Sequence, residues 1–210
     1  TMGKRGGLLQ LLFANVLYWV CAGVYSPFLS AYYARLGLDA SQTGLLLAIT
    51  PMCAIAVQPL WALLADRIGR RRAVIVGLCT AAAAVAPLYY LATTFIAVLS
   101  TTLAFSAFFS ALLPLSDSLV IELASRSGHD FSRIRMGGTV GYAVVVLIVG
   151  RLLDGAPEFQ FLIVSMALIV FAVHVLRLPE TSVNIQSPTE KVGGGSHMVR
   201  DSAPYLRPTR

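Results

Sequence analysis

The hydrophobic pattern of this chain consists of long apolar stretches separated by short polar breaks. A helix needs about 20 apolar residues to cross roughly 30 Å of hydrocarbon at about 1.5 Å per residue. Six stretches are of about this length or longer, and we place them at residues 8–34, 41–65, 73–91, 95–123, 136–153 and 159–178. Backbone groups within a bilayer must bond inside their own segment, and the sequence lacks the alternating pattern of a membrane barrel. We therefore expect an all-α fold with six membrane-spanning helices.

Turn-forming residues occupy the breaks between these stretches. Gly, Asp, Arg and Pro gather at residues 36–39, 67–70 and 154–157, which predicts turns at these positions. Pro27 interrupts the hydrogen-bond ladder of the first stretch and is expected to kink it. The stretch 95–123 is longer than a perpendicular crossing needs, so it should tilt or protrude.

The chain divides into three parts by composition. We expect a short tail over 1–7, a membrane bundle over 8–178 and a polar linker or tail over 179–210, because Pro179 stops the last helix and the sequence after it is polar and rich in Gly and Pro. Residues 194–198 match either a cloning remnant or a natural glycine-rich loop. Residues 205–210 are basic, as expected for a lead-in to a further helix.

Basic residues are concentrated on one side of the predicted membrane. Of the 16 Lys and Arg residues, all except Arg35 and Arg151 fall in the first tail, the second loop, the fourth loop or the segment after residue 176. Cytoplasmic loops are enriched in Lys and Arg. We therefore expect an integral protein of the plasma (bacterial inner) membrane with both termini in the cytoplasm, as an even number of spans requires.

Composition excludes several classes of protein. Hydrophobic residues make up 57% of the chain and charged residues 12%, about half the charged fraction usual for a soluble domain. The net charge of +6 lies in short clusters between apolar stretches, so we expect no nucleic-acid partner. The cysteines and the lone His174 match no metal-ligand spacing, and we expect neither a metal nor a cofactor. Without a nucleophile–base pair or a phosphate loop, an enzyme is not expected.

Ionisable residues inside the predicted spans need a partner or a purpose, because burying them in lipid is expensive. Asp117 lies late in the fourth span and Arg135 opens the fifth. If the two helices are neighbours, the guanidinium can reach the carboxylate. Tyr142 lies seven residues beyond Arg135, on nearly the same helix face. The pair is either a structural ion pair between two helices or, as we favour, part of a solute site that opens to an aqueous cavity.

Polar and aromatic residues also form a stripe on the first span. Asn15, Trp19 and Tyr25 belong to it, and the stripe either lines the same cavity or packs against other helices. The glycines at 137, 138 and 141 allow close helix approach, which we interpret as packing rather than chemistry.

The loop after the second span carries a motif, Asp-Arg-x-Gly-Arg-Arg over residues 66–71. It resembles the signature between the second and third helices of the major facilitator superfamily, with Ala62 where that family usually has Gly. The resemblance implies a cytoplasmic gate latch, in which Asp66 pairs with arginines in one state of a rocking transporter. The implied latch consists of Asp66, Arg67, Gly69, Arg70 and Arg71.

Four further segments resemble the lactose permease and phenylpropionate permease branch of that superfamily, at residues 25–28, 58–60, 114–117 and 131–142. The resemblance implies that Asp117, Arg135 and Tyr142 bind the solute, with Asp in place of Glu and Tyr in place of Trp.

The resemblance also implies the overall function. The chain would be the amino-terminal half of a twelve-helix secondary transporter, built as two inverted three-helix repeats. It would move a small polar solute, such as a sugar or an aromatic acid, by alternating access and proton symport. A second six-helix half would come from a separate chain or a second copy. The alternative is a membrane scaffold, assembly or receptor module that transports nothing.

Overall fold

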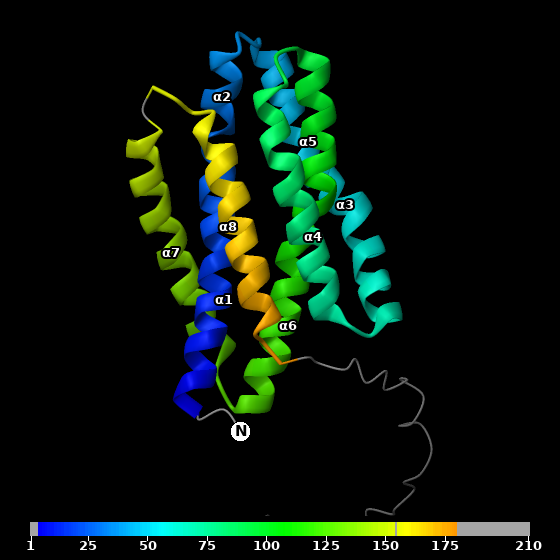
Figure 1. Cartoon of the computed structure of the whole chain (residues 1–210), viewed down its shortest axis with the longest axis vertical. Coiled ribbons are helices and arrows are strands. Elements are labelled where there is room, and N and C mark those ends of the chain that lie inside the picture. Colours follow the sequence, from blue (N-terminus) through cyan, green and yellow to red (C-terminus); the bar gives the residue numbers. More distant parts are fainter. Residues whose placement is uncertain (1–3, 154, 180–210) are drawn as a thin grey trace, which may run out of the picture.

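The computed structural model describes residues 4–153 and 155–179, and over these residues the chain is an all-α bundle (Figure 1). Of the linker or tail expected over 179–210, residues 180–210 lie outside the described residues. Six helical segments are long and apolar enough to cross a membrane, which confirms the predicted all-α fold of six spans. The elements are α1 Lys4–Tyr25, α2 Leu29–Arg35, α3 Ala40–Ile68, α4 Arg71–Val85, the 3-10 helix η1 Ala86–Tyr90, α5 Phe95–Phe109, α6 Leu112–Ser127, α7 Phe131–Leu152 and α8 Phe159–Leu176.

The turns between the spans form where the sequence predicts them. The turn glycines Gly37, Gly69 and Gly155 all have positive φ, between 67° and 84°, a conformation that glycine adopts without steric cost. The turns that hold most of the basic residues, α3–α4 and α6–α7, lie at the same end of the bundle as the start of α1 and the end of α8 (Figure 1). All basic residues of the described chain except Arg35 and Arg151 therefore lie at or near one end, which we call the arginine-rich side.

Two spans are broken into pairs of helices. The first is interrupted between α1 and α2 at Pro27, as predicted. The fourth is interrupted at residues 110–111, which differs from the continuous stretch expected over 95–123. Pro114 has no N–H to offer the carbonyl of Ser110 four residues earlier. The side chain of Gln58 from α3 donates to that carbonyl at 2.8 Å instead, so this amide joins the second span to the break in the fourth.

Helix α7 begins five residues earlier than the expected 136. Asp130 caps its start, and its side chain accepts a hydrogen bond from the Ser132 N–H at 2.9 Å. Arg135 therefore lies within the helix rather than in the loop before it.

The packing of the spans follows a two-fold pattern. The first span packs on α7, and α5 of the fourth span packs on α3; similarly, α1 packs on α8 and α5 packs on α4. If spans one to three are superposed on spans four to six, the contact of α1 with α7 corresponds to that of α5 with α3. The contact of α1 with α8 likewise corresponds to that of α5 with α4. Because each set holds an odd number of spans, the two sets have opposite orientations in the membrane.

Two helices are much less covered than the others. Within the 18-residue apolar segment of each span, 11% of the residues are buried in α3 and 17% in α7, against 44–50% in the other four spans. They lie at opposite edges of the bundle (Figure 1). Their apolar faces need a covering, which the bilayer or a further set of helices can provide.

Candidate functional site

The structure brings Asp117 of α6 and Arg135 of α7 together as an ion pair, as the sequence predicts. The Asp117 side chain is 16% exposed and that of Arg135 is 42% exposed, so the carboxylate is enclosed while the guanidinium remains accessible. Asn15 of α1 donates from Nδ2 to the carboxylate at 3.5 Å. Three helices therefore converge on one charged group.

Aromatic rings cover one side of this pair. The guanidinium carbon of Arg135 lies 5.6 Å from the ring centroid of Trp19, a distance at which a cation is attracted to the ring face. The Trp19 ring meets Tyr142 edge to face, with centroids 5.8 Å apart. Tyr142 is thus connected to the ion pair through Trp19, a residue that the sequence placed only on the stripe of the first span.

Two buried polar atoms beside the pair have no hydrogen-bond partner within the described chain. They are Oδ1 of Asn15, an acceptor, and Nε1 of Trp19, a donor. A buried polar atom without a partner costs about 1–3 kcal/mol. A hydroxyl group can donate to Oδ1 and accept from Nε1. Both atoms are enclosed by the protein, so a small molecule would reach them only after neighbouring side chains move.

Gly138 determines how closely α1 and α7 approach at this point. A Cβ at this residue would collide with Oδ1 of Asn15 and with the Trp19 ring, whose Nε1 would be 2.9 Å away. Our sequence interpretation assigned the glycine cluster to packing alone, and it missed that Gly138 holds two site residues in place. The sequence feature that could have indicated this role is the position of Gly138 between Arg135 and Tyr142 on the same helix face.

Tyr25 does not join this group. It lies six residues beyond Trp19, about 240° around the helix at roughly 100° per residue. Its side chain is buried in the core, where the hydroxyl is 3.2 Å from that of Tyr89 and the ring centroid is 4.5 Å from that of Phe105. For Tyr25 the structure supports helix packing, the second of the two interpretations of the stripe.

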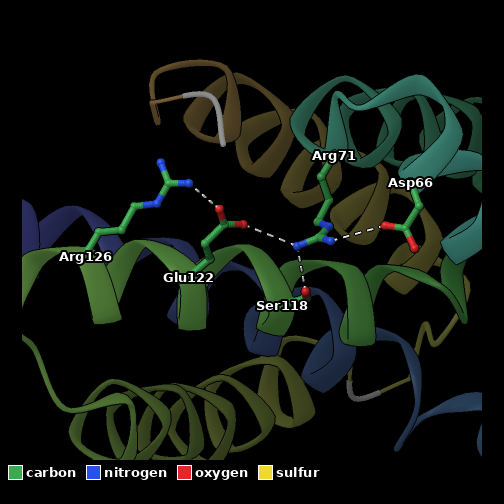
Figure 2. A network of polar contacts seen from close by, with 5 residues as sticks. All are labelled: Asp66, Arg71, Ser118, Glu122 and Arg126. Atoms are coloured by element: carbon green, nitrogen blue, oxygen red, sulfur yellow. Dashed lines mark hydrogen bonds and ion pairs between the residues drawn. The ribbon is translucent and has the colours of Figure 1, made fainter. Parts of the chain in front are cut away.

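A second polar group lies on the arginine-rich side and is centred on Arg71 (Figure 2). Its guanidinium contacts Asp66 at 3.3 Å, donates to Ser118 at 2.9 Å and contacts Glu122 at 3.4 Å. Glu122 also pairs with Arg126 at 2.7 Å. The Arg71 side chain is mostly buried, so this network joins the end of α3 to α6 through one enclosed cation.

The predicted gate residues divide into three kinds. Asp66 and Arg71 meet in the network, and Gly69 ends α3 in a left-handed conformation with φ of 67°. The side chains of Arg67 and Arg70 are exposed and make no hydrogen bond or ion pair with other described residues. Sequence reasoning missed the roles of Ser118 and Glu122, which lie on α6 and meet the motif only in the folded chain.

A cavity of 470 Å³ lies between α3 and α6 beside this network. Gln58, Asp66, Arg71 and Ser118 supply its polar lining. It therefore extends from the network toward the break in the fourth span, where Gln58 bonds to the carbonyl of Ser110.

Comparison with known proteins places these features among membrane transporters. The model of the MFS_1 like family matches residues 8–202. The maltose permease of Geobacillus stearothermophilus is 32% identical over 165 residues, which cover 78% of this chain and 42% of that protein. The uncharacterized transporter YwbF of Bacillus subtilis (strain 168) is 30% identical over 131 residues, which cover 61% of this chain and 33% of the relative.

The fold matches a solved transporter structure. The nucleoside transporter NupG superposes with a TM-score of 0.77 at 21% identity, over 89% of this chain and 47% of NupG. The chain thus spans less than half the length of the relatives it matches.

Proposed function

Because the chain belongs to the MFS_1 like family of membrane transporters and has the fold of the amino-terminal six-helix half of a major facilitator protein, we propose that it forms half of a secondary active transporter. The transporter would move a small hydroxyl-bearing solute by alternating access. A second six-helix half, from the same polypeptide, a separate chain or a second copy, would cover the exposed faces of α3 and α7. The arginine-rich side would face the cytoplasm.

One observation carries this proposal. The Asp117–Arg135 pair lies beside an unpaired acceptor on Asn15 and an unpaired donor on Trp19. Once the enclosing side chains move apart, neighbouring hydroxyls of a solute can bond to both atoms and to the charged pair, while an apolar ring face packs on Trp19 or Tyr142. A purely structural ion pair needs no free donor and acceptor at its side.

The same arrangement favours a sugar-like solute over an aromatic acid. A carboxylate that approached Arg135 would lie close to Asp117, which already carries negative charge, and like charges at contact distance repel. A neutral polyol meets no such repulsion. Maltose and nucleosides, named for two of the similar proteins, both carry several hydroxyl groups.

The proposal is tested by uptake into proteoliposomes that contain this chain together with its second half. Labelled maltose, uridine and phenylpropionate are supplied with and without an inward proton gradient. We expect uptake of a hydroxyl-bearing solute that the gradient drives above equilibrium and that collapse of the gradient abolishes. Uptake of phenylpropionate alone would favour the aromatic-acid alternative. If none of these solutes is taken up or shifts the melting temperature, the scaffold alternative is favoured.

The Arg71 network is the proposed latch of the gate on the cytoplasmic side. Replacing Arg71 with Gln leaves the carboxylates of Asp66 and Glu122 without their shared cation. We expect a loss of about 1–2 kcal/mol in stability, since Arg71 itself is enclosed but Asp66 is half exposed. Uptake should fall severalfold. Thermal unfolding and initial uptake rates measure the two effects.

The control for Arg71→Gln is Arg177→Gln, which removes the same charge from an exposed residue on the same side that has no side-chain partner among the described residues. Equal behaviour of the two variants would show that the network does not stabilise the gate.

A further inference from the structure

A groove of 300 Å³ lies between α3 and α4, with Phe108 of α5 against it. The residues along it include Trp61, Leu64, Ile68, Val74, Gly77 and Leu78. The indole N–H of Trp61 already donates to the carbonyl of Ala107 at 2.9 Å. The lining therefore offers an apolar wall and no free polar group, which suits a hydrocarbon chain rather than a water-soluble ligand.

The groove is shorter than one leaflet of the bilayer. Trp61 and Ile68 mark its extent on α3, and seven residues of helix rise by about 10 Å. This is less than half of a hydrocarbon core of roughly 30 Å. One acyl chain that enters from the arginine-rich side would fill it.

Unneutralised positive charge lies at one end of the groove. The α3–α4 turn follows Ile68 and precedes Val74, and it carries Arg67 and Arg70. Both side chains are exposed, and neither makes an ion pair or hydrogen bond with another described residue. The other two arginines of the turn are engaged: Arg71 in its network and Arg72 with the carbonyls of Leu176 and Leu178.

We propose that this groove binds an anionic phospholipid, with one acyl chain between α3 and α4 and the phosphate against Arg67 and Arg70. Basic residues beside a groove between membrane helices recognise anionic headgroups. The groove is separate from the candidate solute site, which lies on α1, α6 and α7. It is also separate from the cavity beside the Arg71 network, which lies on the face of α3 that carries Gln58, Ala62 and Asp66. The inference depends on insertion in a bilayer and not on the identity of the solute.

Trp61 makes the occupant measurable. The chain has two tryptophans, so a protein whose only tryptophan is Trp61, with Trp19→Phe, reports on the groove by fluorescence. The protein is reconstituted in phosphatidylcholine bilayers to which one brominated lipid is added. This lipid is either phosphatidylglycerol or phosphatidylcholine with brominated acyl chains. A brominated chain in the groove quenches Trp61, and the ratio of quenching at equal mole fractions gives the relative affinity.

We expect brominated phosphatidylglycerol to quench more strongly than brominated phosphatidylcholine. Each arginine contributes about fivefold to the affinity for the anionic lipid. The double variant Arg67→Gln/Arg70→Gln should reduce the preference to about one. Arg133→Gln, which removes an exposed charge at the start of α7, should leave it unchanged. Equal quenching by the two lipids, or a preference that survives the double variant, would overturn the proposal.

A second pair of variants tests the groove itself. A Cβ on Gly77 meets nothing within 4 Å, and the same holds for Gly44 on α3 outside the groove. Gly77→Leu should fill the groove and weaken quenching by both lipids, while Gly44→Leu should not. If Gly77→Leu changes nothing, or neither lipid quenches Trp61 because the second half covers it, the groove is not a lipid site. None of these outcomes depends on solute uptake, so the proposed transport function is tested separately.

Discussion

Replacing Asp117 with Asn, or Arg135 with Gln, is expected to reduce solute uptake by roughly 100-fold. Each change leaves the remaining charge without its counter-ion and removes a group that would bind the solute. Truncating one partner of a hydrogen-bonded charge pair costs about 2–5 kcal/mol. The lower part of that range applies here, because the Arg135 side chain is 42% exposed and water screens it. A loss of about 3 kcal/mol corresponds to roughly 100-fold in binding.

The same measurement separates a binding role from a structural one. Asp117→Glu keeps the negative charge and should retain part of the uptake. Arg133→Gln is the matched control for Arg135→Gln, since it removes an exposed charge two residues away on the same helix. Thermal unfolding measures whether each variant is still folded. Wild-type uptake in both Asp117→Asn and Arg135→Gln would refute the site, and parallel loss of uptake and folding would make the pair structural.

Replacing Gly138 with Ala should destabilise the protein and abolish uptake, although alanine is the better helix former by about 1 kcal/mol. The added Cβ would collide with Oδ1 of Asn15 and with the Trp19 ring. Asn15 is 2% exposed, so its side chain is enclosed by neighbouring residues. Overpacking of this kind costs about 1–3 kcal/mol, which outweighs the gain in helix propensity. If α7 shifts instead, Arg135 is displaced from Trp19 and uptake falls at least about tenfold.

Gly137→Ala is the matched control for this effect. A Cβ on Gly137 would lie 3.2 Å from Cγ of Leu12, and a flexible leucine side chain can adjust by a few tenths of an ångström. This variant should fold and transport like the wild type. Melting temperature and initial uptake rate measure both proteins. Equal behaviour of Gly138→Ala and Gly137→Ala would mean that close approach of α1 and α7 does not shape the site.

The packing of the six spans explains how residues from three helices come together in the candidate solute site. Its charged pair spans α6 and α7, while Asn15 and Trp19 come from α1. The first and fourth spans occupy equivalent places in the two-fold pattern, and α1 packs on both α6 and α7. The candidate site therefore lies where the two three-helix sets meet.

The sequence by itself determined the number of spans, the turns between them, the arginine-rich side and the approach of Arg135 to Asp117. These features are local. Hydropathy within about 20 residues selects a membrane helix, and a single turn separates the helices that carry the two charges, 18 residues apart.

The tertiary structure decided which residues from distant spans complete each group. It alone shows that Gln58 bonds to the carbonyl freed by Pro114, that Glu122 joins Arg71, that Gly138 holds Asn15 and Trp19 in place, and that Tyr25 lies in the core. Asn15 and Asp117 are 102 positions apart, and no periodicity along the chain relates them. Such contacts depend on which helix faces meet and how closely, and only the packing of all six spans sets both.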